Sequence, residues 1–201
     1  MRSEASQNRR KKRNEWRLPS LAALLVVFAA APGVCHGQET DFQKHLAPFV
    51  PMPASIVDRF LEAASIKPGE LVYDLGCGDG RLLIAAAQQF KARAVGIEIS
   101  PKLVKAATQA VQKSGLQDRV RVIHGDILDV DLSPADVVTI YLLTESNTRL
   151  RPHFERDLKP GSRVVSYEFP VRGWKASRVS EVEAHSRNHL IYVYEMPPLK
   201  Q

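Results

Sequence analysis

The stretch at residues 71–83, LVYDLGCGDGRLL, constrains the fold more than any other part of the chain. Its first residues predict a buried strand, which is followed by Asp74, by a turn containing Gly76, Gly78 and Gly80, and by an apolar helical pattern. Glycines in such a turn adopt positive φ and let a ligand approach the backbone closely. A strand, a glycine turn and a helix start in this order are typical of nucleotide-binding α/β sheets.

The spacing and charge of this turn indicate what kind of ligand it binds. Dinucleotide-binding turns follow G-x-G-x-x-G, whereas the third glycine here comes one residue early. Asp74 and Asp79 would repel a pyrophosphate and suit a cationic or amine-bearing ligand. An ordinary glycine-rich turn between a strand and a helix is the alternative interpretation.

The turn resembles motif I of the class I S-adenosylmethionine (SAM) methyltransferases, whose ligand carries a sulfonium and an α-ammonium group. This resemblance implies that SAM is the cofactor. It also implies that the turn contributes these contacts to SAM: Asp74, Gly76, Cys77, Gly78, Asp79 and Gly80.

Acidic residues at the ends of two further predicted strands extend the expected cofactor site. The strand at 92–99 contains Glu98, where one carboxylate can accept hydrogen bonds from both ribose hydroxyls. After the strand at 119–124, the resemblance implies that Asp126 holds the adenine amino group. An ordinary strand-end charge is the alternative for each residue. The neighbouring Ile99 and Ile127 complete the predicted cofactor contacts.

The order of the remaining segments predicts an α/β fold, namely a Rossmann-like class I methyltransferase. Further strands are expected at 135–143 and 163–169, and a C-terminal antiparallel pair at 178–184 and 189–195 closes a seven-stranded, mostly parallel sheet. Helices are expected between the strands, and Ser100 is expected to cap one of them, with Pro101 in its first turn. The long helix that usually follows the fifth strand is missing, and Gly173 leads into the antiparallel pair instead.

A set of motifs across residues 49–195 resembles one methyltransferase family in particular. The motifs are PFVP, VYDLGCGDGR, VGIEIS, HGDI, YLL and RVVSYEFP. They are similar to those of the lysine methyltransferases of the ATP synthase c-subunit and of the adenine nucleotide translocase, together with bacterial relatives. The resemblance implies methyl transfer from SAM to a protein lysine ε-amine. Two alternatives are a small-molecule N- or O-methyltransferase and a SAM-binding protein without catalysis.

Three residues are predicted to line the acceptor site, because the fourth and fifth strands end at the crevice of the sheet. They are Tyr141, Glu145 and Glu168, and Glu168 is placed to hold the lysine ammonium by hydrogen bonding. A structural surface role is the alternative for each. Methyl transfer needs alignment more than acid–base groups. No metal site is predicted.

The proline-rich segment at residues 48–53 is expected to be an extended arm ahead of the first helix. It resembles the segment before motif I in the same lysine methyltransferase family. That resemblance implies that the arm, through Phe49, covers the cofactor. The alternative is an arm that covers the hydrophobic core.

The N-terminus has the composition of a targeting segment. Residues 1–37 hold seven Lys/Arg against two Asp/Glu, and a cationic stretch precedes the apolar run at 21–31. We expect a signal peptide-like or membrane-anchor segment at 1–37, a linker, arm and first helix at 38–66, and the methyltransferase domain at 67–201. The protein would then be exported or membrane-associated, in the bacterial periplasm or inner membrane or in a mitochondrion. SAM is made in the cytosol, which is in tension with this expectation.

The distribution of charge also bears on the partner. Residues 38–201 hold 21 Lys/Arg and 20 Asp/Glu, so the body of the chain is close to neutral. A neutral body lacks the basic surface that nucleic acid requires. The fourth predicted strand also ends in YLL rather than in the [DNS]-P-P-[YFW] motif of base-amino methyltransferases. Nucleic acid is therefore not the expected partner, and the family resemblance implies a protein instead. Membrane association of that protein and the oligomeric state are left open.

Overall fold

The computed structural model describes residues 47–200, so the expectations for residues 1–37 and for most of the linker lie outside the described part of the chain. The elements in chain order are α1 (Ala54–Ala63), β1 (Leu71–Leu75), α2 (Arg81–Gln89), β2 (Arg93–Glu98), α3 (Pro101–Lys113), β3 (Val120–His124), β4 (Val137–Ile140), α4 (Thr144–Asp157), β5 (Arg163–Tyr167), β6 (Trp174–Lys175), β7 (Arg178–Ala184), β8 (Arg187–Glu195) and β9 (Leu199–Lys200).

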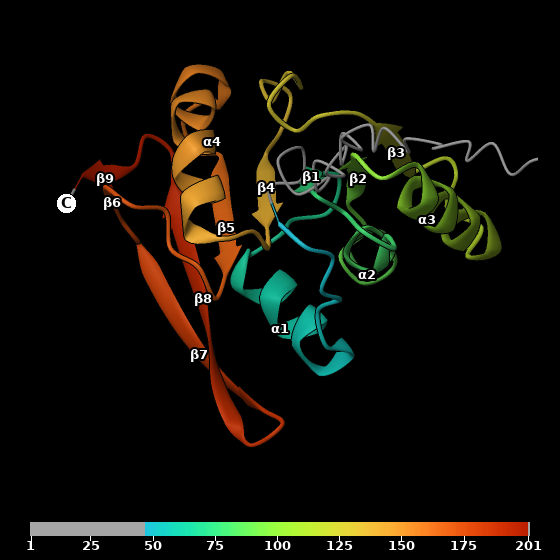
Figure 1. Cartoon of the computed structure of the whole chain (residues 1–201), viewed down its shortest axis with the longest axis horizontal. Coiled ribbons are helices and arrows are strands. Elements are labelled where there is room, and N and C mark those ends of the chain that lie inside the picture. Colours follow the sequence, from blue (N-terminus) through green and yellow to red (C-terminus); the bar gives the residue numbers. More distant parts are fainter. Residues whose placement is uncertain (1–46, 201) are drawn as a thin grey trace, which may run out of the picture. The chain divides into compact units, whose positions relative to one another are not determined.

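Seven strands form one sheet in the order β3-β2-β1-β4-β5-β8-β7. The first five are parallel, and β8 and β7 join as antiparallel neighbours of β5. This confirms the predicted seven-stranded, mostly parallel sheet with its C-terminal antiparallel pair (Figure 1). The strand order reverses between β1 and β4, which is where doubly wound sheets bind their ligands.

The two faces of the sheet bury separate hydrophobic cores. Helices α1, α2 and α3 cover one face, where Phe60 and Leu83 pack on alternate residues of the strands. Helix α4 covers the other face through Leu150 and Phe154, and Trp174 packs beside it. Because strand side chains alternate between faces, the same strands supply both cores. Both apolar layers therefore hold the carboxyl ends of the parallel strands in place.

The strands end earlier than the sequence pattern predicts, and local backbone geometry explains each end. Strand β4 stops at Ile140 because Leu143 becomes the N-cap of α4. Strand β5 stops at Tyr167 because Glu168 has a φ of 64°, a left-handed conformation that is costly for a residue other than glycine. The fourth and fifth parallel strands are thus shorter than expected, and the segments beyond them turn away as loops.

The C-terminal region contains two features that the sequence pattern does not reveal. The β7–β8 hairpin turns on His185 and Ser186, both with positive φ, so β8 begins two residues before the predicted strand. Two-residue hairpin turns normally carry Asn-Gly or Asp-Gly, and neither is present. A second, two-stranded sheet pairs β6 with β9. Its strands have two residues each, too few to show a period.

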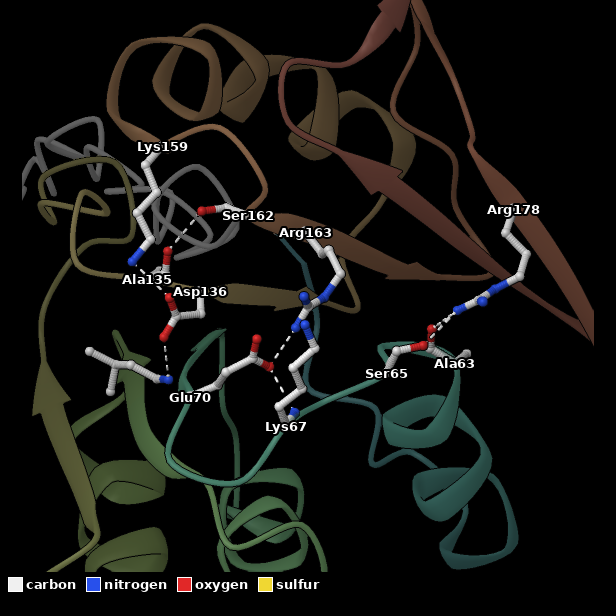
Figure 2. A network of polar contacts seen from close by, with 11 residues as sticks. Ala63, Ser65, Lys67, Glu70, Ala135, Asp136, Lys159, Ser162, Arg163 and Arg178 are labelled. Carbon is white, nitrogen blue, oxygen red and sulfur yellow. Dashed lines mark hydrogen bonds and ion pairs between the residues drawn. The ribbon is translucent and has the colours of Figure 1, made fainter.

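A polar network ties the amino ends of the parallel strands together (Figure 2). The Asp136 carboxylate accepts a hydrogen bond from the Leu71 backbone N–H at 2.8 Å and pairs with the Lys159 ammonium at 2.7 Å. The Glu70 carboxylate pairs with the Arg163 guanidinium at 2.5 Å, and neither side chain is more than one fifth exposed. The network fixes the start of β1 against the starts of β4 and β5, at the end of the strands opposite their carboxyl ends.

No helix within residues 47–200 has the length and apolar character needed to cross a membrane.

Candidate active site

A cavity of about 330 Å³ lies at the carboxyl ends of β1, β2 and β4, where the strand order reverses. Residues 47–52, which include most of the arm, form one wall, and the glycine turn after β1 forms another. The wall on the far side comes from the ends of β2 and β4 and from the loop after β3. The lining residues that carry polar side chains or shape the turn are Asp74, Gly76, Cys77, Gly78, Asp79, Arg81, Glu98, Ser100, Asp126 and Tyr141.

The glycine turn has the conformation that its sequence predicts. Gly76, Gly78 and Gly80 have φ values of 83°, 55° and 80°, a region that side-chain-bearing residues rarely adopt. The backbone N–H groups of Gly76 and Cys77 donate to the Ile97 carbonyl at 2.8 and 3.0 Å. The turn is therefore fastened to β2 and exposes its backbone to the cavity.

Glu98 is oriented by two backbone donors at the end of β2. Its Oε2 accepts a hydrogen bond from the Gly78 N–H at 3.0 Å, and its Oε1 accepts one from the Ser100 N–H at 2.9 Å. Each carboxylate oxygen can accept more than one hydrogen bond, so both retain capacity for ligand hydroxyls. Ser100 also caps α3, with Pro101 at the first helical position, as the sequence predicts.

Asp74 is almost completely buried at the end of β1, between the turn and β4. The Thr139 hydroxyl donates to its Oδ1 at 2.8 Å. Burial raises the pKa of the Asp74 carboxyl to about 7, the Thr139 hydrogen bond opposes this, and the nearby carboxylates of Glu98 and Asp79 add to it. A cationic ligand would relieve this accumulation of negative charge.

Asp79 and Arg81 form an ion pair beside the cavity. The Arg81 Nε donates to the Asp79 carboxylate at 2.9 Å and a terminal nitrogen approaches it at 2.5 Å. These hydrogen bonds lower the pKa of Asp79 below its ordinary value. The other terminal nitrogen of Arg81 donates to the Met52 carbonyl at 2.6 Å. Arg81 thus joins the glycine turn to the arm.

The arm also touches the turn through an aromatic ring. A Cβ at Gly78 would overlap the Phe49 ring, so the absence of a side chain there lets the ring lie against the backbone. Phe49 nevertheless remains half exposed, at 49%. The structure places the arm over the cavity, in the position that the family resemblance implies.

Most of the other predicted cofactor residues also line the cavity, but Gly80, at the N-cap of α2, does not. Asp126 accepts a hydrogen bond from the Leu128 N–H on Oδ1 at 2.9 Å, and Ile99 and Ile127 supply apolar wall. Cys77 packs its thiol where a side chain at Gly96 would otherwise lie. Burial raises the pKa of that thiol, which suits a space-filling residue rather than a reactive one.

The three predicted acceptor residues do not converge on the cavity. Tyr141 lines it and packs edge-to-face against Tyr167, with ring centroids 4.7 Å apart. Glu145 is exposed on the first turn of α4, where it pairs with Arg172 at 3.4 Å. Glu168 is turned by its positive φ, and its carboxylate lies 2.6 Å from Nδ1 of the buried His189. Neither glutamate is part of the cavity lining.

Sequence reasoning missed the polar partners that lie far away along the chain. Thr139 lies outside the quoted motifs. Arg81 ends the motif VYDLGCGDGR but had no predicted role, and its contact with Met52 spans 29 residues. Pairing of β1 with β4 brings Thr139 opposite Asp74, and only the strand register could have predicted it. Within residues 47–200, no group of three or more His, Cys, Asp or Glu side chains is arranged to hold a metal ion.

The residues of the cavity fit SAM. Buried carboxylates suit its ammonium and sulfonium charges, Glu98 suits its ribose hydroxyls, and the aliphatic walls suit its adenine. A parallel sheet of this order with this site at its reversal point defines a SAM-dependent methyltransferase of class I.

Comparison with known proteins identifies the branch of this class. The family described as the ANTKMT methyltransferase domain matches residues 74–178. A protein-lysine N-methyltransferase of Saccharolobus islandicus is 45% identical over 148 residues, which cover 73% of this chain and 92% of that protein. The chain belongs to the ANTKMT methyltransferase domain family.

Two further relatives have different names. The adenine nucleotide translocase lysine N-methyltransferase of Mus musculus is 33% identical over 64% of this chain, and the match spans 56% of that longer protein. A crystal structure of an RNA methyltransferase from Salinibacter ruber, in complex with S-adenosyl-L-homocysteine (SAH), is 41% identical. It superposes with a TM-score of 0.70 over 73% of this chain and 94% of its own.

Proposed function

We propose that this enzyme transfers the methyl group of SAM to the ε-amine of a lysine in a protein. The observation that carries the proposal is the cavity at the reversal point of the sheet, with the arm as one of its walls, in a chain 45% identical to a named protein-lysine N-methyltransferase.

The proposed reaction demands alignment from the protein and little acid–base chemistry. SAM supplies a methyl group on a positively charged sulfur, and the amine displaces it in line, forming an N–C bond as the C–S bond breaks. Holding the reacting atoms about 3–3.5 Å apart provides much of the acceleration. A lysine amine has an ordinary pKa of about 10.4, so its proton must leave to solvent before attack.

The cofactor contacts that we propose follow from the geometry of the cavity. Glu98 accepts the ribose hydroxyls on the free lone pairs of its two oxygens. Asp126 accepts the adenine amino group on its second oxygen, since the first is taken by the Leu128 N–H. Asp74, at the buried end, faces the positive charge of the methionine portion. Tyr141 forms the wall on the acceptor side.

The rim of the cavity supports an acceptor with apolar neighbours. Phe49, Val50 and Leu143 are three of the five large hydrophobic side chains that are exposed within residues 47–200, with exposures of 49%, 53% and 41%. Phe49 and Val50 line the cavity, and Leu143 follows the lining residue Leu142. Apolar side chains gathered at the mouth of a site mark a surface for a partner. We therefore propose a lysine flanked by apolar residues, as in a membrane-associated protein.

Labelled SAM and a membrane extract test the acceptor class. We expect label on protein, removable by protease and recovered as methyl-lysine after hydrolysis, and clearly less label with Asp126→Asn when SAM is kept below the Kd of the wild type. Label in the organic phase would identify a small-molecule acceptor and contradict the proposal. Label removed by ribonuclease would do the same, and would favour RNA, the acceptor class named for the Salinibacter ruber protein.

We also propose that residues 1–37 direct the protein to a membrane or across it. The basis is the cationic and apolar sequence of that segment, with seven Lys/Arg before the break at Pro32. A chain that begins at Gln38 should then fold and bind SAH with unchanged affinity, while losing membrane association in cell fractionation. Fractionation of the full chain entirely with the soluble cytosolic proteins would contradict the proposal.

A further inference from the structure

The charges around the cavity are unbalanced. Among the lining residues are four carboxylates, on Asp74, Asp79, Glu98 and Asp126. Within the described part of the chain, Arg81 is the only lysine, arginine or histidine that lines the cavity. The methionine portion of SAM carries a carboxylate as well as an ammonium, and a carboxylate among four others is repelled unless a cation meets it.

The Arg81 guanidinium has hydrogen-bonding capacity left over. It carries five N–H groups, of which Nε–H and one terminal N–H point at Asp79, and one N–H of the other terminal nitrogen points at the Met52 carbonyl. Among residues 47–200, this leaves one N–H on each terminal nitrogen without a hydrogen-bond acceptor. Two N–H groups on neighbouring nitrogens are the arrangement with which arginine binds a carboxylate.

We propose that Arg81 binds the α-carboxylate of SAM and of its product SAH, and thereby couples cofactor binding to closure of the arm. The Asp79–Arg81 pair presents a negative and a positive group side by side. An α-amino acid presents the complementary pair, an ammonium next to a carboxylate. The proposal rests on the donor site alone and holds whatever the methyl acceptor is.

The coupling follows from the second contact of the same side chain. Met52 is buried, and its carbonyl, which Arg81 holds, directly precedes Pro53 at the N-cap of α1. Phe49 lies against Gly78 on the same arm. A carboxylate bound to Arg81 lowers the freedom of the guanidinium, so the contact with Met52 persists for as long as the ligand is bound. Cofactor and arm therefore share one residue.

A comparison of two ligands isolates the carboxylate contact. SAH and S-adenosyl-3-thiopropylamine, which lacks only the carboxylate, are titrated calorimetrically into the wild type and into Arg81→Gln. We expect Arg81→Gln to weaken SAH binding about 10- to 100-fold, the range of a charge-assisted hydrogen-bond pair. The affinity for the decarboxylated ligand should fall less than about threefold in the same variant, because this ligand has no carboxylate for Arg81 to bind.

Equal losses for both ligands would overturn the proposal, since Arg81 would then act only through the fold of the turn. No loss for either ligand would overturn it as well. Arg59→Gln is the matched control, because Arg59 forms an exposed pair with Glu62 on α1. If Arg81→Gln does not fold, Arg81→Lys keeps the charge without the paired N–H groups, and the loss should again be larger for SAH.

Hydrogen exchange tests the coupling separately. The prolines at 48, 51 and 53 have no amide hydrogen, so the arm reports through Phe49, Val50 and Met52. SAH should slow exchange at these amides severalfold in the wild type, and the decarboxylated ligand at saturation should slow it less. Equal slowing by both saturating ligands would overturn the coupling. Both measurements omit an acceptor, so their failure is distinct from failure of the lysine assignment.

Discussion

The environment of Asp74 makes the stability of the protein depend on pH. Its pKa in the folded protein is about 7, against 3.8 ordinarily, because burial disfavours the carboxylate. A group whose pKa is higher in the folded protein than in the unfolded chain stabilises the fold at pH values below its unfolded-state pKa. This stabilisation is lost as the pH rises through its folded-state pKa. The ligand-free protein therefore loses stability from Asp74 between about pH 4 and pH 7.

Asp74→Asn should remove this loss. The amide keeps an oxygen for the Thr139 hydroxyl and carries no charge to bury. We expect the ligand-free variant to exceed the wild type in unfolding free energy by on the order of 3 kcal/mol near pH 8, and by much less near pH 4. Urea unfolding at both pH values measures this. An advantage of the same size at both would show that Asp74 does not titrate in this range.

A substitution at Asp126 should change cofactor affinity while leaving the stability of the fold nearly unchanged. Asp126→Asn keeps the oxygen that accepts from the Leu128 N–H, but replaces by a donor the other oxygen, which we propose accepts from the adenine amino group. We expect SAH affinity to fall about tenfold, with a change in unfolding free energy below about 1 kcal/mol. Calorimetry and thermal unfolding measure the two quantities. Unchanged affinity in this variant would remove Asp126 from the cofactor site.

At the scale of elements, the arm determines whether the cavity is closed. Phe49 is half exposed and contacts the turn rather than the core, so its loss should cost little stability. We expect Phe49→Ala to reduce kcat/KM for methyl transfer more than tenfold and to shift Tm by less than about 3 °C. Val179→Ala, at a similarly exposed residue of β7, serves as the control. If activity and Tm fall together in Phe49→Ala, the arm serves only to cover the hydrophobic core.

The elements differ in how well the sequence predicts them. The motif-bearing β1, turn and α2, and the Ser100 cap of α3, follow from local rules of backbone and capping chemistry, and the structure has them as expected. The ends of β4 and β5 do not, because Leu143 is an N-cap without a capping side chain and Glu168 adopts a left-handed φ that its residue type does not favour. Arg81 was missed because its Met52 partner becomes a neighbour only once the arm folds back.

The roles assigned to Glu145 and Glu168 show a limit of reasoning from strand ends. Both residues do follow parallel strands, as the acceptor prediction assumed. Glu145 lies on the first turn of a helix and points to Arg172 in solvent, while Glu168 pairs with His189 of β8. Side-chain direction beyond a strand end depends on the loop conformation, which no periodicity encodes. The positions of Glu98, at the end of β2, and of Asp79, in the turn, could be predicted because backbone N–H groups orient their carboxylates.

At the scale of the whole molecule, the Glu70–Arg163 pair should matter for folding and not for binding. It is largely buried in the network at the amino ends of the strands (Figure 2), whereas the cavity lies at their carboxyl ends. Arg163→Leu leaves the Glu70 carboxylate buried without its cation, which typically costs about 3–5 kcal/mol. We expect a loss of about 3 kcal/mol in unfolding free energy and SAH affinity within twofold of the wild type, measured below the midpoint of unfolding. A large loss of affinity in the folded variant would contradict this separation.

The placement of that network has an evolutionary consequence. Mutations at the carboxyl ends of the strands, and in the loops that face an acceptor, leave the cross-links at the amino ends intact. Such mutations can therefore accumulate without unfolding the protein. Relatives that share 33–45% of their residues with this chain are named for a protein lysine or for RNA. Because the stabilising contacts lie at the opposite end of the sheet from the active site, the methyl acceptor can change during evolution while the methyl donor stays the same.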